Sequence, residues 1–486
     1  MAFAKLSLIG LCFAVLSTGC YRFLPSDGGG QTDFSSPREV NAADVAVPPG
    51  YVVDVVATHL TFPTGIAFDN AGAPYVVESG YAYGEVWTEP KLFRINTDSS
   101  LTEIARGGRN GPWNGVTYDG EAFFVAEGGQ LEGGRIVRIS LDGKVSSVVD
   151  NLPSLGDHHT NGPVVGPDGK LYFGQGTATN SGVVGVDNYD YGWLARFPTF
   201  HDTPCKDIVL SGQNFETPNP LKDGADSQVR TGAFSPFGAP TKRGQIVEGA
   251  LPCSGAITRL NTDGTELELV AWGFRNPFGL AFSPEGELYI TENGYDVRGS
   301  RPVWGSGDYL WRVQENTWYG WPDYAGGMAL DREYFAPPRK AQPVTLLAEH
   351  PNRPPQPTAT FGVHASANGI DFSRTGQFGF QGQAFVAEFG DLSPGTGKSL
   401  HPVGYRVVRV DPETGHITDF ATNKPPQSGP ASKLGTAGLE RPVSVRFDNS
   451  GTALYIVDFG VMLTGEKGPV AIPGTGVVWR IRPEEL

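Results

Sequence analysis

NPFGLAFSPEGELYITENG (276–294) is the stretch that decides the fold. It contains a short apolar strand, a polar turn with glycine, and a second apolar strand that ends in an acid, an amide and a glycine, which is the pattern of a β-hairpin. Similar segments recur along the chain. The other copies are FPTGIAFDNAGAPYVVESG (62–80), PWNGVTYDGEAFFVAEGG (112–129), HTNGPVVGPDGKLYFGQG (159–176), SANGIDFSRTGQFGFQGQAFVAEFG (366–390) and RPVSVRFDNSGTALYIVDFG (441–460).

A second hairpin with a basic or tryptophan-bearing strand stands between several of the copies, as in GRIVRISLDGK (134–144) and VVWRIRPEEL (477–486). Two hairpins make a four-stranded blade, and such a sheet cannot bury both faces alone. We therefore expect an all-β fold, a six-bladed β-propeller of four-stranded blades over residues 47–486. An open β-sandwich with repeated hairpins is the alternative, but the even spacing of the copies and the closure of exposed strand edges favour the propeller.

Two long segments interrupt the repeat. Residues 177–255 and 295–362 are rich in Pro, Gly and aromatic residues and exceed ordinary loop lengths. We expect both to be functional insertions over one face of the propeller.

The composition agrees with a turn-rich β protein. The 486 residues include 66 Gly and 39 Pro, too many for long helices, while an aromatic content of 11% is too high for a disordered chain. The formal net charge of −15 argues against nucleic acid or an anionic membrane as the main partner, because both require a basic surface. Small neutral ligands remain open.

The N-terminus MAFAKLSLIGLCFAVLSTGC (1–20) has one Lys, an apolar run and then small residues, which is the order of a secretory signal peptide. Its end resembles a bacterial lipoprotein processing site, so we expect lipidation at Cys20; ordinary cleavage nearby is the alternative. The protein is then exported, periplasmic or anchored to the outer membrane. Residues 21–46 are expected to form a flexible tether, because Ser26–Asn41 is too polar to bury a core.

Two cysteines, Cys205 and Cys253, remain after the leader. In an oxidising compartment we expect them to form a disulfide, which would contribute at most roughly 4 kcal/mol in the chain-entropy model. Metal ligation is the alternative, but the chain lacks the second CxxC or the HxxxH that it would need.

Aligning the copies shows which residues share the mouth of each inner strand. That column reads Phe62, Pro112, His159, Asn276, Ser366 and Arg441, with Arg275 and His364 beside it. Pro and Phe there are ordinary packing residues. Histidine, asparagine and two arginines crowded near an axis require a ligand or each other, so we expect the functional site at this mouth.

Several of these segments resemble one family. HTNGPVVGPDGKLYFGQG (159–176), GFRNPFGLAF (273–282), Glu-Asn-Gly (292–294) and Tyr-Gly-Trp-Pro (319–322) resemble, in order and spacing, the soluble glucose and sorbosone dehydrogenases that use pyrroloquinoline quinone (PQQ). The resemblance covers most of residues 50–486. It implies PQQ-dependent oxidation of a sugar or sugar-derived hydroxyl or aldehyde by hydride transfer to the quinone, with electrons passed to an external acceptor.

The resemblance also implies roles for single residues. His159 matches the family's base, Arg275 the arginine that stabilises a developing oxyanion, and Asn276 a hydrogen-bonding neighbour. Lys398 and Arg441 lie about where the family holds the PQQ carboxylates. His158 is expected to point the other way, as a solvated residue or a support for the site.

The family binds Ca²⁺ through backbone carbonyls of a Gly-Pro pair, and here those positions are Gly294 and Tyr295. Phe278 stands where glucose-oxidising members have Gln, so sorbosone-type and other pyranose-oxidising members are the better comparison for the substrate. The chain has no CxxCH haem-attachment motif, which is why the acceptor is expected to be a separate molecule.

Two other functions stay open at this point. In a propeller lactonase, channel acids would hold a metal that polarises an ester carbonyl, and the acids that end the repeats are the candidates: Glu78, Glu127, Glu292, Glu388 and Asp458. Their recurrence at one strand end favours a structural hydrogen bond instead. A non-catalytic propeller that binds carbohydrate or protein on its face is the third possibility.

Overall fold

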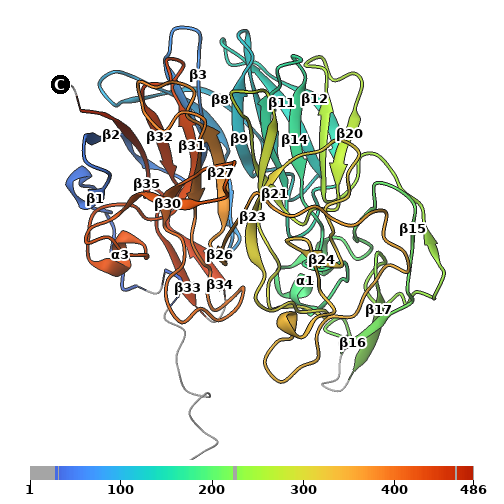
Figure 1. The fold of residues 1–486 in the computed structure, drawn as a ribbon. Helices are drawn as coiled ribbons and strands as arrows, with labels where there is room; N and C mark the ends of the chain where they lie inside the picture. The colour runs from blue at the N-terminus through green and yellow to red at the C-terminus, as the bar shows by residue number, and fades with distance from the viewer. Residues whose placement is uncertain (1–27, 31, 223–226, 466–467, 485–486) are drawn as a thin grey trace, which may run out of the picture.

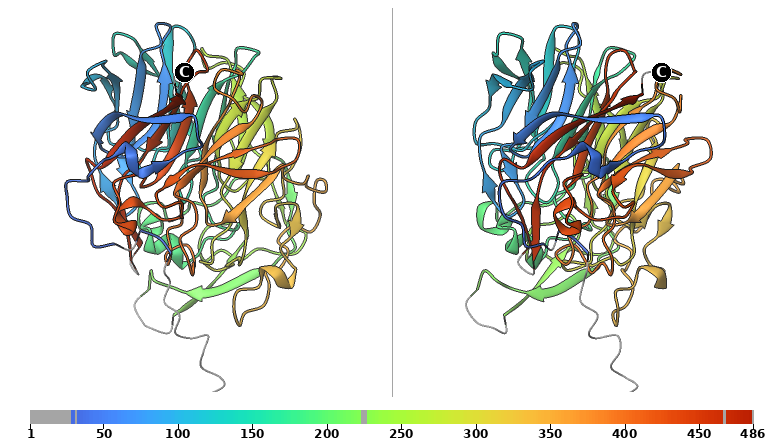
Figure 2. Two further views of the ribbon diagram at one scale, coloured as in Figure 1. Left: turned by 60° about the vertical axis from the view of Figure 1, so that its left-hand side comes forward. Right: turned by 90° about the vertical axis from the view of Figure 1, so that its left-hand side faces the viewer.

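The computed structural model describes residues 28–30, 32–222, 227–465 and 468–484, and it confirms the predicted six-bladed propeller (Figure 1). Six four-stranded antiparallel sheets stand around one axis. Their innermost strands contact each other in chain order, and the sixth contacts the first, so the ring is closed. Figure 2 shows the same ring from two further sides.

The blades follow the chain, and four strands run from the axis outward in each. Blade one consists of β3 (Pro63–Phe68), β4 (Pro74–Glu78), β7 (Lys91–Ile95) and β8 (Leu101–Arg106). Blade two consists of β9 (Trp113–Tyr118), β10 (Ala122–Glu127), β11 (Gly134–Ser140) and β12 (Val145–Leu152). Blade three consists of β13 (Thr160–Val165), β14 (Leu171–Gln175), β19 (Ala256–Leu260) and β20 (Glu268–Trp272). Blade four consists of β21 (Pro277–Phe282), β22 (Leu288–Glu292), β23 (Gly307–Arg312) and β26 (Ala359–Val363). Blade five consists of β27 (Ala367–Phe372), β28 (Ala384–Glu388), β29 (Arg406–Val410) and β30 (Ile417–Asn423). Blade six consists of β31 (Pro442–Phe447), β32 (Leu454–Asp458), β35 (Gly476–Pro483) and β2 (Tyr51–Leu60).

The sixth blade joins the two ends of the chain. Its outer strand β2 comes from the N-terminal side and pairs antiparallel with β35, with Tyr51 opposite Pro483 and Val53 opposite Ile481. This pairing leaves no open edge between the first and the last blade, which stabilises the ring against opening.

The acids that end the second strands make the same structural hydrogen bonds in several blades. Glu292 accepts from the backbone N–H of Arg275 and from the indole of Trp311. Asp458 does the same with Arg441 and Trp479. The other three also receive N–H donors, Glu78 from Thr61, Glu127 from Asn110 and Trp113, and Glu388 from Arg406. Four of these acids therefore fasten their blades near the start of the inner strand, whereas Glu388 binds Arg406 of the third strand β29.

The N-terminal side of the domain departs from the prediction. Residues 21–46 are expected to be a flexible tether, but Arg38 is buried, lies 2.7 Å from the Asp458 carboxylate and donates to two backbone carbonyls. Strand β1 (Val45–Ala46) pairs with β30 as a fifth strand. The tether prediction is wrong for this described part, because one buried ion pair fixes it to the blade. The leader 1–20, with Cys20, lies outside the described residues.

The insertions gather at one end of the propeller, the lower end in Figure 1, as predicted. The bounds of the second one are wrong, because 295–362 also includes blade strand β23 and most of β26. The first carries α1 (Val186–Asp190), α2 (Trp193–Arg196), β15 (Ile208–Val209), β16 (Asn214–Pro218), β17 (Gln228–Gly232) and β18 (Ile246–Val247). The remaining short elements are η1 (Ala42–Asp44), β5 (Tyr81–Ala82), β6 (Val86–Trp87), β24 (Tyr324–Ala325), β25 (Met328–Ala329), η2 (Glu333–Phe335), α3 (Ala431–Leu434), β33 (Met462–Gly465) and β34 (Gly468–Ala471). Within the described residues, no helix has the length and apolar character needed to span a membrane.

The disulfide is confirmed. Cys205 and Cys253 are joined with an S–S distance of 2.01 Å and close a loop of 48 residues in the first insertion. The bridge ties this insertion back to the start of β19.

Candidate functional site

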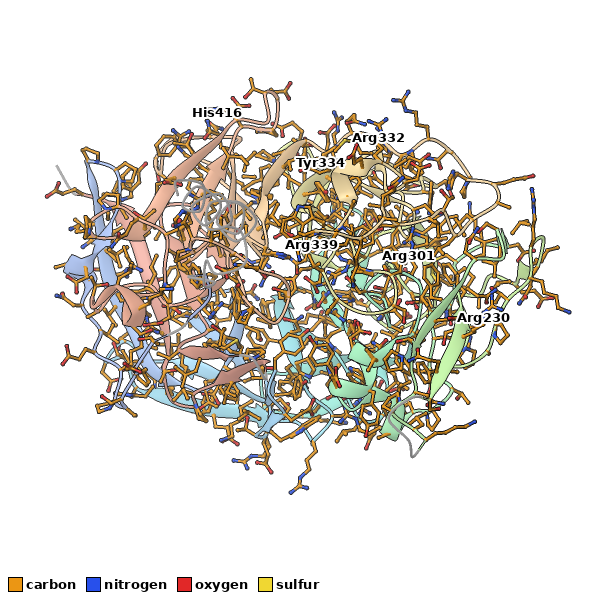
Figure 3. The ribbon with its side chains drawn as sticks, turned by 90° about the horizontal axis from the view of Figure 1, so that it is seen from below. Arg230, Arg301, Arg332, Tyr334, Arg339 and His416 are labelled. Carbon is orange, nitrogen blue, oxygen red and sulfur yellow. A yellow bond between two sulfur atoms is a disulfide. The ribbon has the colours of Figure 1, made fainter. Side chains whose placement is uncertain are left out.

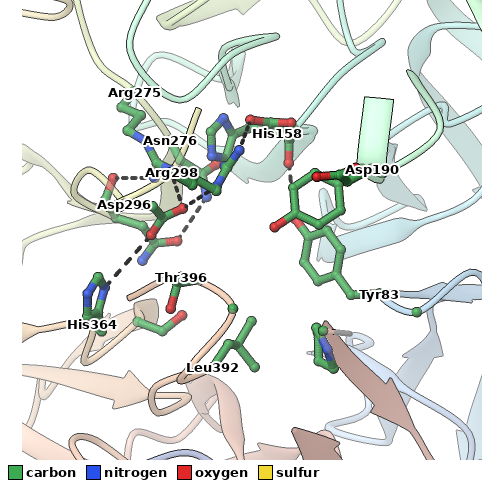
Figure 4. A pocket seen from close by; sticks show the side chains of 18 of the residues that line it. Tyr83, His158, Asp190, Arg275, Asn276, Asp296, Arg298, His364, Leu392 and Thr396 are labelled. Carbon is green, nitrogen blue, oxygen red and sulfur yellow. Dashed lines mark hydrogen bonds and ion pairs between the residues drawn. The ribbon is translucent and has the colours of Figure 1, made fainter. Parts of the chain in front are cut away.

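A cavity of about 340 Å³ opens at the insertion end of the propeller (Figure 4). Its lining comes from the β5–β6 hairpin, the segment before β13, the α1–α2 insertion, the turns around β21 and β22, the loop after β28 and the β33–β34 hairpin. Figure 3 shows this end of the molecule and labels Arg230, Arg301 and Arg339 of the insertions. The size is within the range of cofactor and ligand pockets.

His158 is the histidine from the third repeat that lines the cavity. Its Nδ1 lies 2.9 Å from the backbone oxygen of Thr177 and 3.1 Å from the hydroxyl of the same residue. Burial, and then the charges of Arg275 and Arg298, hold the pKa of His158 well below its usual value of 6.5. The ring is therefore neutral at neutral pH, which is the form that accepts a proton.

His159, the predicted base, lies behind the cavity wall. It is buried, its ring nitrogens lie 3.0 and 3.2 Å from the amide nitrogen of Gln130, and its ring packs against Tyr81 and Tyr83. Burial lowers the pKa of His159 to about 4. The two histidines have thus exchanged the positions that the sequence assigned to them. The reason is that β13 begins only at Thr160, so strand alternation does not apply to the residues before it.

Arg275 lines the cavity, as predicted, and is held rigidly. Its Nη2 lies 2.8 Å from the Asp296 carboxylate and 2.9 Å from the amide oxygen of Asn180, to which its Nε also donates. Burial opposes ionisation of Asp296, yet Arg275 and Arg298 hold the pKa of this carboxyl below its usual value. A fixed guanidinium of this kind can stabilise negative charge that develops in the cavity.

Arg298 was missed by the sequence reasoning. Its guanidinium joins three acids, at 2.7 Å from Asp157, 2.7 Å from Asp187 and 3.0 Å from Asp296. The three acids come from different segments, and Arg298 stands in the irregular part of the second insertion where no periodic pattern is available. The one usable signal is that Asp157 directly precedes the His158–His159 pair.

Asn276 also lines the cavity, as predicted. Its amide takes part in a chain of asparagine side chains: Asn161 donates to Asn276 at 2.9 Å, Asn276 donates to Asn293 at 2.9 Å, and Asn293 donates to Asn368 at 3.2 Å. Asn114 donates to Asn161 in the same sense. These bonds fix the orientation of the Asn276 amide through residues on four blades.

Of the two predicted calcium positions, only Gly294 lines the cavity. Its N–H donates to Asp308 at 2.8 Å; a Cβ at this position would lie 2.1 Å from the Gly307 oxygen, so the backbone approach requires glycine. Burial raises the pKa of Asp308 to about 7. Tyr295 is buried away from the lining, and its hydroxyl donates to the Tyr324 carbonyl.

Arg441 and Lys398 stand outside the lining. Arg441 is fully buried behind the wall formed by Gly390 and Leu392, with its guanidinium between the rings of Phe389 and Tyr405. Its Nη1 donates to backbone oxygens, while its Nε and Nη2 have no hydrogen-bond partner within the described residues. Lys398 is exposed on the loop after β28. Phe278, the predicted substrate marker, lines a separate small cavity of about 40 Å³.

An aromatic wall faces these polar groups. Tyr83 from the β5–β6 hairpin and Tyr191 from the α1–α2 insertion line the cavity, and the Tyr83 hydroxyl donates to the Asp157 carbonyl at 3.1 Å. His364, whose Nδ1 lies 3.8 Å from Asp296, completes the lining on the other side. The cavity therefore offers aromatic side chains next to fixed charges of both signs, an arrangement suited to a ring-shaped ligand with polar substituents.

The lactonase interpretation receives no support from the repeat-end acids. All five are engaged in structural hydrogen bonds, and no group of three His, Cys, Asp or Glu in the described part of the chain is arranged to hold a metal ion.

Comparison with known proteins agrees with the predicted resemblance. No established family profile matches the chain. It is 26% identical over 185 residues to quinoprotein glucose dehydrogenase B of Acinetobacter calcoaceticus, and the match spans 38% of this chain but only 30% of that relative. The resemblance to PQQ-dependent sugar dehydrogenases is thereby confirmed as a similarity over part of the chain.

Solved structures share the fold. The PQQ-bound aldose sugar dehydrogenase of Streptomyces coelicolor is 17% identical, with 90% of this chain and 99% of that one covered and a TM-score of 0.51. The holo form of the pyranose dehydrogenase PQQ domain of Coprinopsis cinerea is 14% identical, with 94% and 100% covered and a TM-score of 0.54. At such identities the likeness shows the propeller fold alone.

Proposed function

We propose that this protein is a PQQ-dependent dehydrogenase that oxidises a sugar or sugar-derived hydroxyl or aldehyde and passes the electrons to an external acceptor. The observation that carries the proposal is the neutral His158 beside the fixed Arg275 in one cavity. A base and a cation at the same site are what abstraction of a hydroxyl proton requires.

The residues fit the cofactor. PQQ is planar and anionic, and the cavity presents the aromatic faces of Tyr83 and Tyr191 together with the cations Arg275 and Arg298. The unpartnered donors of buried Arg441 add positive charge behind the Gly390 wall. When bound, PQQ supplies the two-electron acceptor for the substrate carbon.

The chain's own residues then have distinct tasks. His158 takes the hydroxyl proton at Nε2, since its Nδ1 is turned to Thr177. Arg275 stabilises the negative charge left on the substrate oxygen, and Asn276 orients the same region through its fixed amide. We propose that the backbone carbonyls of Gly294 and Tyr295 bind Ca²⁺. Lys398 and Arg441 remain proposed contacts for the PQQ carboxylates.

Reconstitution tests this proposal. Purified protein is mixed with PQQ and Ca²⁺, binding is followed by absorbance, and reduction of a dye is measured with a panel of aldoses, sugar aldehydes and lactones. We expect stoichiometric PQQ binding and PQQ-dependent dye reduction with at least one sugar. Absence of PQQ binding overturns the redox function. Lactone hydrolysis without PQQ would point to the lactonase alternative, and sugar binding without turnover to a binding propeller.

A matched pair of variants assigns the base. We expect His158→Gln to lower kcat at least about 100-fold, the range for loss of a general base, and His159→Gln to keep kcat within a few-fold of the parent. The opposite result would return the role to His159. Absorbance after PQQ addition serves as the control that both variants still bind the cofactor.

Export and lipidation remain part of the proposal. Expression of the full chain in a Gram-negative host, followed by fractionation and mass spectrometry, tests them with Cys20→Ser as the control. We expect the parent in the membrane fraction with a lipid-modified N-terminus and Cys20→Ser without that modification. An unmodified parent in the soluble periplasm would exclude lipidation and favour export with ordinary cleavage of the signal peptide.

A further inference from the structure

We infer that Thr177 is a positioning residue that decides which nitrogen of His158 carries the proton. It holds the ring as the Nδ1–H tautomer and leaves Nε2 as the basic atom for the cavity. The inference concerns the histidine itself, and it gains catalytic meaning from the proposed function.

The first observation is the double contact at Nδ1. The backbone oxygen of Thr177 lies 2.9 Å from Nδ1 and its hydroxyl oxygen lies 3.1 Å away. A carbonyl oxygen only accepts hydrogen bonds, so Nδ1 must carry the proton to satisfy it. In a neutral imidazole the second nitrogen is then unprotonated.

The second observation removes the alternative. A hydroxyl with a free proton could donate to Nδ1 and favour the other tautomer. The Thr177 hydroxyl instead donates to the Thr179 carbonyl at 2.7 Å, again an atom that only accepts. Its proton is committed, and toward His158 it offers only a lone pair.

The third observation is that the turn carrying these groups is braced. Asp202 accepts from the Ala178 N–H at 2.6 Å and from the Thr179 hydroxyl at 2.5 Å. The neighbouring residue Thr203 exchanges hydrogen bonds with Ser254, and the disulfide joins Cys205 to Cys253 next to it. The tautomer is therefore fixed by a turn that cannot easily move.

The charges around the ring explain why neutral acceptors are used. Arg275, Arg298 and His159 all act to lower the pKa of His158, while Asp157 and Asp296 are each paired with Arg298. The hydrogen-bond partners at Nδ1 are neutral oxygens of Thr177. The base thus stays unprotonated, and only its orientation and tautomer are imposed.

Nuclear magnetic resonance of the cofactor-free protein tests the inference. With ¹⁵N-labelled histidine, the nitrogen shifts report the tautomer of each ring, and His158→Gln identifies the signal of His158. We expect the Nδ1–H form in the parent and in Thr177→Ser, which keeps the hydroxyl. In Thr177→Val we expect the ratio of Nδ1–H to Nε2–H to fall about three- to tenfold, the worth of one neutral hydrogen bond.

Thr258→Val is the matched control, because Thr258 is a buried threonine whose hydroxyl has no hydrogen-bond partner within the described residues. It should leave the His158 signal unchanged. Should Thr177→Val not fold, Thr177→Ala is measured in its place. An Nε2–H signal in the parent overturns the inference. A Thr177→Val spectrum equal to that of the parent overturns the part assigned to the hydroxyl, because valine keeps the backbone oxygen.

The same variants separate this inference from the proposed function. In PQQ-loaded protein we expect Thr177→Val to lower kcat about three- to tenfold with KM unchanged, and Thr177→Ser to restore it. Failure of PQQ binding would overturn the dehydrogenase proposal and leave the tautomer result unchanged. A normal tautomer response with unchanged kcat would show that the ring is not the base.

Discussion

Blades four and six begin with the same construction and end with different chemistry. In each, an arginine stands just before the inner strand and an acid at the end of the second strand accepts its backbone N–H, together with a tryptophan indole. The side chain of Arg275 then meets Asp296 at 2.8 Å and lines the cavity. The side chain of Arg441 meets two aromatic rings and backbone oxygens, behind the cavity wall.

The two blades differ in the segment after the second strand. After β22 the segment 293–306 supplies Asp296 and Arg298, whereas after β32 the segment 459–475 forms the β33–β34 hairpin, which reaches the cavity through Gly468 and Pro469. The repeat therefore places the backbone of each arginine, and the residues of the segment after the second strand decide whether its charge is paired with an acid and exposed to a ligand. Four predictions test this contrast, from the largest expected effect to the smallest.

The largest effect is expected for Arg275→Lys. Lysine keeps the charge but cannot bind Asn180 and Asp296 together in the planar geometry of the guanidinium. We expect kcat of the PQQ-loaded protein to fall about 100- to 1000-fold, as for loss of a fixed oxyanion donor. Arg106→Lys, at an exposed arginine with surface ion pairs, is the control. A loss below tenfold would remove Arg275 from the proposed mechanism.

How far the sequence predicts the site depends on the same contrast. The repeat alignment found Arg275, Asn276 and Gly294 because these residues adjoin regular strands, whose positions are set by hydrophobic alternation. It predicted that His159 would line the cavity, whereas His158 does, because both residues precede β13. It missed Arg298 and placed Arg441 at the lining because side chains in and behind irregular loops are positioned by tertiary contacts between distant segments.

The second prediction compares the two tryptophans of the blade anchor. One oxygen of Glu292 accepts from the Trp311 indole at 2.6 Å, whereas the matching oxygen of Asp458 also accepts from Arg38 and from the Glu440 N–H. We expect Trp311→Phe to destabilise the protein by about 1–3 kcal/mol more than Trp479→Phe, because only the first leaves a buried carboxylate oxygen unsatisfied. Urea unfolding measures both, and equal losses would mean that the two anchors are equivalent.

The third prediction is the pH dependence that follows from the burial of His158 and from the neighbouring cations of blade four. The pKa of His158 lies well below 6.5, so the ring loses its proton, and the base becomes active, at a lower pH than an ordinary histidine. We expect kcat/KM to change less than about twofold between pH 8 and pH 6, whereas a base with a pKa of 6.5 would lose about three quarters of its activity. An acid limb centred near pH 6.5 would contradict the assigned environment of His158. Dye reduction by free PQQ at each pH is subtracted as the control.

The smallest effect on stability is expected for Arg441→Met. Burial of an unpaired guanidinium costs several kcal/mol, and its contacts with backbone oxygens and two aromatic rings offset only part of that cost. Methionine fills the same slot between Phe389 and Tyr405 without a charge and packs well against rings. We therefore expect the Tm of the cofactor-free protein to stay within a few degrees of the parent or to rise.

The loaded protein completes this test. If the two unpartnered donors of Arg441 serve the carboxylates of PQQ, Arg441→Met weakens PQQ binding measured by absorbance titration, while the Tm without PQQ is kept. A large loss of Tm would mean that Arg441 serves to hold blade six together. An unchanged PQQ affinity with an unchanged Tm would leave Arg441 outside the site and confine the anion-binding charges to Arg275 and Arg298 of blade four.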